Sequence, residues 1–102
     1  MITEDYCSFE IAKLLKEKGF DEKVISFYPP GDIQRPTHQM AMKWLRENGI
    51  IIEILHVTSK PSNDGWFYSY QKNNDSETNL IEYPSYEDAV ETALKYVLKN
   101  LI

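Results

Sequence analysis

The sequence predicts an α+β protein with two layers, in which helices cover a mainly antiparallel sheet of three or four strands. Two observations support this expectation. The segment from 84 to 102 is amphipathic at helical spacing and needs a surface to cover, and the middle of the chain is rich in β-branched and aromatic residues. We expect the order α-β-α-β-β-β-α, with the C-terminal helix packed on the sheet.

The C-terminal helix is the best-specified element. Ser85 is expected as its N-cap, and Glu87 and Asp88 favour the positively polarised first turn. An apolar stripe recurs at helical spacing and consists of Tyr86, Ala89, Val90, Ala93, Leu94, Val97 and Leu101. Such a stripe has to be buried, which predicts that this helix lies against the sheet.

A first helix is predicted from about Glu4 to Lys18, with Thr3 as its N-cap. Gly19 suits the left-handed conformation that ends many helices, and Phe20 is then placed to fold back on Leu15. The predicted buried stripe of this helix consists of Cys7, Ile11, Leu14 and Leu15.

A second helix is predicted from Thr37, as its cap, to about Glu47, and Asn48-Gly49 ends it. The predicted strands are Val24–Tyr28, Ile50–Val57, Trp66–Gln71 and Leu80–Tyr83. Because Ile50–Val57 is largely apolar on both faces, we expect a central strand that is covered at least partly on both sides. Thr58–Gly65 and Lys72–Asn79 are expected as polar connections, the first of them within a hairpin.

Length and composition indicate one domain that spans residues 1–102. The net charge of -5 argues against nucleic acid as a general partner, since phosphate binding normally relies on positive charge. The single cysteine rules out an intrachain disulfide, and the sequence shows neither a signal-peptide pattern nor a membrane-length apolar run. We therefore expect a cytoplasmic protein with no membrane contact.

Patterns that would indicate catalysis or metal binding are sparse. The two histidines, His38 and His56, have no paired spacing, so neither a metal site nor a cofactor is predicted. Cys7 is expected to pack as a small hydrophobic residue on the first helix, and His38 is expected to be exposed near a helix start. No catalytic residue is assigned, and a small enzyme that uses His56 or Cys7 is the least favoured alternative.

Two surfaces are candidates for binding. Trp66, Tyr68 and Tyr70 lie on one face of a predicted strand, where they would form a stacking platform for single-stranded nucleic acid or anchor a peptide. The alternative is that these rings pack under the C-terminal helix. The second candidate is the proline-rich loop from 29 to 36, which presents Asp32 and Arg35.

Three blocks of the chain, 7–20, 36–47 and 86–102, resemble small uncharacterised proteins that prophages and other mobile elements of gut bacteria encode. The resemblance brings no established activity or catalytic residues. It implies a bacterial cytoplasm and an accessory role in a mobile element. Our leading hypothesis is a non-catalytic interaction module that binds an unidentified protein, or a second copy of itself as a homodimer.

Overall fold

The computed structural model describes residues 5–22, 24, 26–57, 65–73 and 75–102. These residues form three helices and five strands: α1 (Phe9–Glu17), β1 (Phe27–Tyr28), β2 (Ile33–Gln34), α2 (His38–Glu47), β3 (Ile50–Val57), β4 (Gly65–Lys72), β5 (Asp75–Tyr83) and α3 (Tyr86–Asn100). The predicted α+β class is confirmed. The order differs by one strand, because β2 lies in the predicted proline-rich loop and pairs antiparallel with β1.

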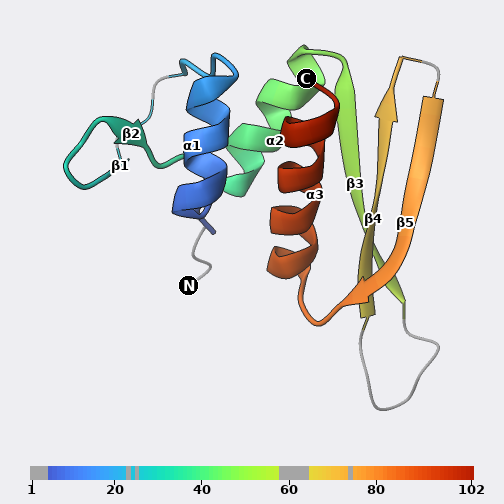
Figure 1. The fold of residues 1–102 in the computed structure, drawn as a ribbon. Coiled ribbons are helices and arrows are strands. Elements are labelled where there is room, and N and C mark those ends of the chain that lie inside the picture. Colours follow the sequence, from blue (N-terminus) through green and yellow to red (C-terminus); the bar gives the residue numbers. More distant parts are fainter. Residues whose placement is uncertain (1–4, 23, 25, 58–64, 74) are drawn as a thin grey trace.

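The main sheet is antiparallel in the order β3-β4-β5, and the labelled helices lie on one side of it (Figure 1). Helix α3 contacts all three strands, α2 contacts β3 and α3, and α1 contacts α3. The expectation of a central, doubly covered strand at residues 50–57 is wrong. This strand is an edge of the sheet, and on its outer face Ile51 and Leu55 are 40% and 37% exposed.

The core lies between the inner face of the sheet and the three helices, with α3 at its centre. Ile50, Ile52 and Tyr68 are buried on the inner face of the sheet. The α3 residues that are fully buried are Ala89, Val90, Ala93, Leu94, Val97 and Leu98. This confirms the predicted stripe in its centre and widens it by Leu98, because α3 is packed between the sheet and α1. No described helix is long and apolar enough to cross a lipid bilayer.

The start of α1 corrects the predicted helix boundary. Ser8 is the N-cap, and its Oγ accepts a hydrogen bond from the Ile11 N–H at 3.3 Å. The preceding residues are extended instead of helical, because the Cys7 N–H donates to the Pro36 carbonyl at 2.8 Å and Tyr6 pairs with Thr37. Long-range pairing therefore competes successfully with the local tendency of residues 5–8 to form a helix, while the predicted cap Thr3 and start Glu4 lie outside the described residues.

The end of α1 is the predicted Schellman closure. The Gly19 N–H donates to the Lys16 carbonyl at 3.1 Å, and the Phe20 N–H donates to the Leu15 carbonyl at 2.9 Å. Gly19 has a φ of +94°, a conformation that residues with a Cβ rarely adopt.

We expect Gly19→Ala to lower the free energy of unfolding by about 1 kcal/mol, the cost of a left-handed alanine. A Cβ at this position would meet no heavy atom within 4 Å, so the penalty comes from the backbone alone. Urea denaturation followed by circular dichroism measures the effect. Lys13→Ala, at an exposed position of the same helix, is the control and should change stability by no more than about 0.5 kcal/mol. Equal stability of the two variants would contradict the prediction.

Two predicted strand boundaries also change. Of the strand expected at Val24–Tyr28, the structure has Phe27–Tyr28 as β1, and Ile25 lies outside the described residues. The polar connection expected at Lys72–Asn79 is mostly part of β5. Asn73, which follows β4, has a φ of +58°, and Lys72 of β4 pairs with Asp75 of β5. The first half of β5 pairs with β4 through its backbone, but its side chains are polar. The sequence there consequently lacks the alternation of apolar and polar residues that indicates a strand. Apart from Gly65, the predicted connection Thr58–Gly65 lies outside the described residues.

Candidate functional site

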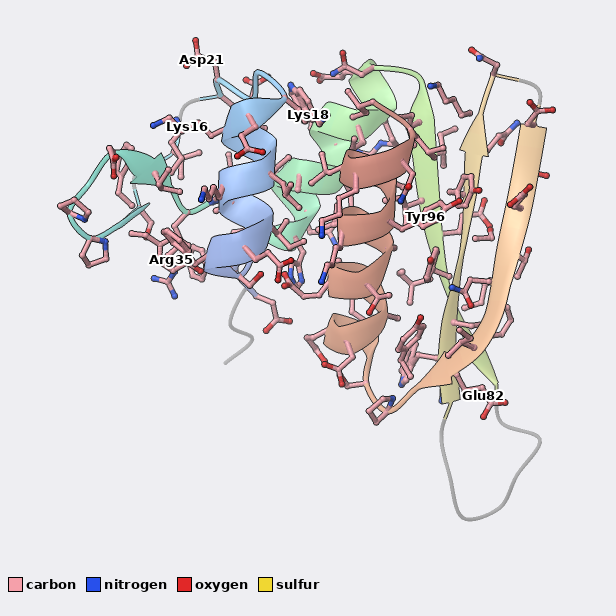
Figure 2. All side chains as sticks on the ribbon, viewed as in Figure 1. Lys16, Lys18, Asp21, Arg35, Glu82 and Tyr96 are labelled. Carbon is pink, nitrogen blue, oxygen red and sulfur yellow. The ribbon has the colours of Figure 1, made fainter. Side chains whose placement is uncertain are left out.

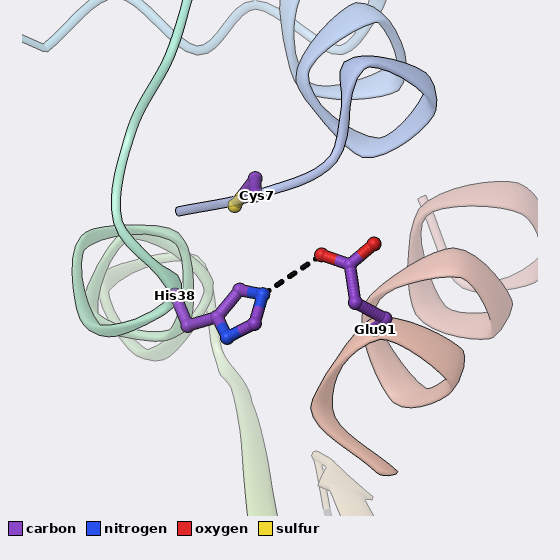
Figure 3. A group of neighbouring side chains, drawn as sticks. All are labelled: Cys7, His38 and Glu91. Atoms are coloured by element: carbon purple, nitrogen blue, oxygen red, sulfur yellow. Dashed lines mark hydrogen bonds and ion pairs between the residues drawn. The ribbon is translucent and has the colours of Figure 1, made fainter. Parts of the chain in front are cut away.

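Three potentially reactive side chains meet where the N-terminal segment, the start of α2 and the middle of α3 come together (Figure 3). They are Cys7, His38 and Glu91, and one potential ligand atom from each lies within 4.8 Å of the other two. Cys7 is fully buried, His38 is 4% exposed and the Glu91 side chain is 29% exposed. Cys7 and His38 are therefore shielded from solvent, and solvent reaches the cluster at the Glu91 carboxylate.

His38 is held by the cap of its own helix. The Thr37 Oγ1 accepts a hydrogen bond from the Met40 N–H at 3.2 Å, which fixes His38 as the first residue of α2. The His38 backbone N–H donates to the Asp5 carbonyl at 2.9 Å. Its ring Nε2 lies 2.8 Å from Glu91 Oε2, while ring Nδ1 is buried with no hydrogen-bond partner among the described residues.

The expectation that His38 is exposed is wrong. The buried residues of α2 are His38, Ala41, Met42 and Leu45, which recur at helical spacing on one face. The same spacing is visible in the sequence. Positions 38, 41, 42 and 45 share one face of a helix, so this spacing is the signal that places His38 on the buried side.

Cys7 is buried as expected, although it precedes α1 instead of lying on it. Its Sγ lies 3.7 Å from the Thr37 carbonyl as a weak donor, and its own carbonyl accepts a hydrogen bond from the Tyr28 hydroxyl. Burial, together with the nearby negative charge of Glu91, raises the pKa of the Cys7 thiol to about 12. At neutral pH the side chain is therefore a thiol, which is a poor nucleophile.

Glu91 joins α3 to both other segments of the cluster. Its Oε2 is the acceptor for the Ser8 backbone N–H at 3.1 Å as well as the partner of the His38 ring. Burial acts to raise the pKa of the Glu91 carboxyl, but the hydrogen bonds from His38 and Ser8 outweigh burial and hold this pKa below its usual value. Glu91 is thus a carboxylate that ties the three segments together.

The aromatic residues predicted as a binding platform lie on the inner face of the sheet, toward α3. The Trp66 ring is 5.5 Å from the ring of Tyr86, and the Tyr70 ring is 5.4 Å from that of Tyr96. Tyr68 is only 2% exposed. Of the two alternatives for these residues, the structure therefore shows packing under the C-terminal helix.

The predicted loop residues lie elsewhere and have internal contacts. The Arg35 guanidinium sits 4.0 Å from the centre of the Tyr6 ring, and the Asp32 carbonyl accepts a hydrogen bond from Lys16 Nζ at 3.0 Å. Figure 2 shows Arg35 beside α1, whereas Tyr96 projects from α3 toward the sheet. The predicted binding residues consequently do not form one continuous surface.

The outer face of the sheet is a second candidate site. Ile51 and Leu55 are exposed there, and Leu55 lies directly opposite the half-buried Phe67 in the register of β3 with β4. A shallow hollow beside them is lined in part by Ile51, Glu53 and Gln71. No described helix covers this face, so the apolar side chains Ile51 and Leu55 of the edge strand β3 are exposed to solvent.

Comparisons of the chain with protein-family models, with curated proteins and with solved structures find no match.

Proposed function

We propose that this protein is a non-catalytic interaction module that binds another protein through the outer face of its sheet. The observation that carries the proposal is the one-sided arrangement of the fold. Helices cover one face of β3-β4-β5, while Ile51 and Leu55 remain exposed on the other, next to Phe67. Apolar side chains grouped on an exposed, regular surface are typical of protein-binding sites.

The chemistry of the interior supports this function over an enzymatic one. Cys7, a candidate nucleophile, is fully buried, and its thiol has a pKa of about 12. The His38 ring beside it points its Nε2 at Glu91. A buried, protonated thiol offers a substrate neither access nor a nucleophile.

The arrangement of the aromatic rings also favours a protein over single-stranded nucleic acid as the partner. Base stacking needs open ring faces, and Trp66, Tyr68 and Tyr70 are directed toward α3. Glu53 on the outer face and the net charge of -5 add electrostatic repulsion against phosphates. A partner with an apolar patch and a basic rim fits this surface better.

The partner that we propose is a host or phage protein, in keeping with the expectation that a mobile element encodes this chain. A second copy of this chain, joined through the same face, is compatible with the module and would give a symmetric dimer. Light scattering of the purified protein distinguishes a self-associating module from a monomer that awaits a different partner.

We expect the double variant Ile51→Ser/Leu55→Ser to bind its partner at least about tenfold more weakly, since losing about 1.4 kcal/mol of binding free energy has that effect. Both side chains are exposed, so the fold should be retained. Tagged protein is incubated, with nuclease, in a lysate of cells that carry the gene, and recovered proteins are quantified by mass spectrometry.

The matched control for this experiment is Phe27→Ser. Phe27 is 47% exposed but belongs to β1, outside the main sheet. A partner that is recovered with the native chain and the control, and lost with the double variant, supports the outer face as the binding site. Equal recovery with the double variant would refute it. A parallel incubation without nuclease is the second comparison, and a partner recovered only in that incubation would refute direct binding of a protein.

A further inference from the structure

We propose that Cys7, His38 and Glu91 form a binding site for a divalent zinc ion. The inference starts from the convergence of a sulfur, an imidazole nitrogen and a carboxylate oxygen, the three kinds of atom that bind zinc in proteins. The residues come from three separate segments of the chain, and Figure 3 shows the His38 ring and the Glu91 carboxylate pointing at one another with Cys7 beside them. The three residues are distant in sequence, so the fold brings them together.

The distances are close to those that a tetrahedral site needs. Zinc–ligand bonds of about 2.0 to 2.3 Å place neighbouring ligand atoms about 3.3 to 3.7 Å apart. His38 Nε2 and Glu91 Oε2 are 2.8 Å apart, and all three ligand atoms lie within 4.8 Å of one another. Side-chain movements of about 1 Å therefore suffice, because rotation about χ1 or χ2 displaces these atoms by more than that.

The backbone that carries the ligands is already fixed. The Cys7 N–H is bound to the Pro36 carbonyl at 2.8 Å, and the His38 N–H is bound to the Asp5 carbonyl at 2.9 Å. Glu91 lies inside the longest helix described, α3. A site whose ligands are held in place loses little conformational entropy when the ion binds.

Binding of a metal at Nε2 requires a change of tautomer in the His38 ring. When the ring is neutral, its contact with the Glu91 carboxylate requires the proton on Nε2, which leaves Nδ1 as an acceptor. Nδ1 has no hydrogen-bond partner among the described residues, so it can take the proton without breaking a bond, and the zinc–Nε2 bond then has to offset the cost of a buried N–H without an acceptor. Nε2 then presents its lone pair to the ion.

The charges of the site balance with a divalent ion. On binding, the Cys7 Sγ–H bond breaks, an Sγ–zinc bond forms and the proton passes to solvent. The resulting thiolate and the Glu91 carboxylate carry two negative charges, which a Zn²⁺ ion neutralises in a half-closed environment. Glu91, with 29% of its side chain exposed, provides the path by which the ion enters and water completes the coordination.

Cobalt(II) is the probe for this site, because its thiolate complexes absorb in the near ultraviolet and its tetrahedral complexes absorb in the visible. The full chain is freed of metal with a chelator, desalted and titrated with Co²⁺ under reducing conditions. We expect saturation at one equivalent with both sets of bands, followed by their loss when Zn²⁺ is added. Absence of the near-ultraviolet band at saturating cobalt would overturn the proposal.

Variants assign the spectrum to the three residues. Cys7→Ser should abolish the near-ultraviolet band, and His38→Gln and Glu91→Gln should weaken binding at least about tenfold, each variant being checked for native circular dichroism. The matched control is His56→Gln, which removes the other histidine of the chain and should bind as the native protein does. Native-like cobalt binding by Cys7→Ser, or loss of binding in His56→Gln, would place the metal elsewhere and refute the site.

Discussion

Leu94→Ala is expected to lower the free energy of unfolding by about 3 kcal/mol, the largest effect that we predict for a single substitution in this chain. Leu94 is fully buried in the middle of α3, the helix that contacts all three strands of the main sheet as well as α1 and α2. Truncation removes the apolar contacts of the side chain and leaves a cavity. Rigid elements on every side of α3 restrict the collapse of that cavity.

Urea denaturation monitored by circular dichroism measures this effect, with an unchanged slope against denaturant as the sign that the unfolding reaction is the same. Lys95→Ala is the control at the next position of α3. Lys95 is exposed and pairs with Glu10 at 3.1 Å across the surface, so its loss should cost no more than about 1 kcal/mol. Similar losses in the two variants would show that α3 is not the central packing element.

The helices were predictable because their signals are local. Thr37 and Ser85 cap α2 and α3 where the sequence places them, with side-chain oxygens that accept from the N–H groups three residues later. Gly19 ends α1 for a stereochemical reason that depends on one residue. The start of α1 is the exception. The sequence predicts Thr3 as the cap, which lies outside the described residues, whereas the structure has Ser8 as the cap and pairs the preceding residues with a distant segment.

The strands were less predictable because their environment depends on partners far along the chain. Ile51 and Leu55 are apolar yet exposed, and no property of the segment reveals that it forms an edge of the sheet. The first half of β5 has the opposite character. Its polar residues read as a loop, but backbone pairing with β4 makes them a strand. In both cases the sheet order, a nonlocal property, determines the outcome.

The candidate site was only partly predictable for the same reason. The sequence indicates that Cys7 is buried, and the structure agrees. The sequence does not indicate its neighbours, because His38 and Glu91 are 53 residues apart and neither belongs to a short ligand motif. Metal-binding motifs in sequences are recognised by short spacings. A site assembled from three separate segments has none, and the packing of α2 and α3 against the N-terminal segment creates it.

Glu91→Leu is expected to lower the free energy of unfolding by about 2 kcal/mol, measured by urea denaturation in the presence of a chelator so that no metal contributes. The substitution removes the acceptor of two hydrogen bonds, one from the His38 ring at 2.8 Å and one from the Ser8 N–H at 3.1 Å. Water can replace the bond to the exposed Ser8. The His38 ring is 4% exposed, so both of its nitrogens would be left without a partner.

A double-mutant cycle separates this polar interaction from simple packing. In His38→Leu/Glu91→Leu no polar ring remains to be satisfied, so the double variant should be more stable than the sum of the two single losses implies, by about 1 kcal/mol or more. Additivity within about 0.3 kcal/mol would instead mean that the hydrogen bond contributes nothing to holding α2 against α3. Strong coupling in the metal-free protein would show that the ligands are brought together before any ion arrives. The same contact would then both stabilise the fold and preorganise the proposed metal site.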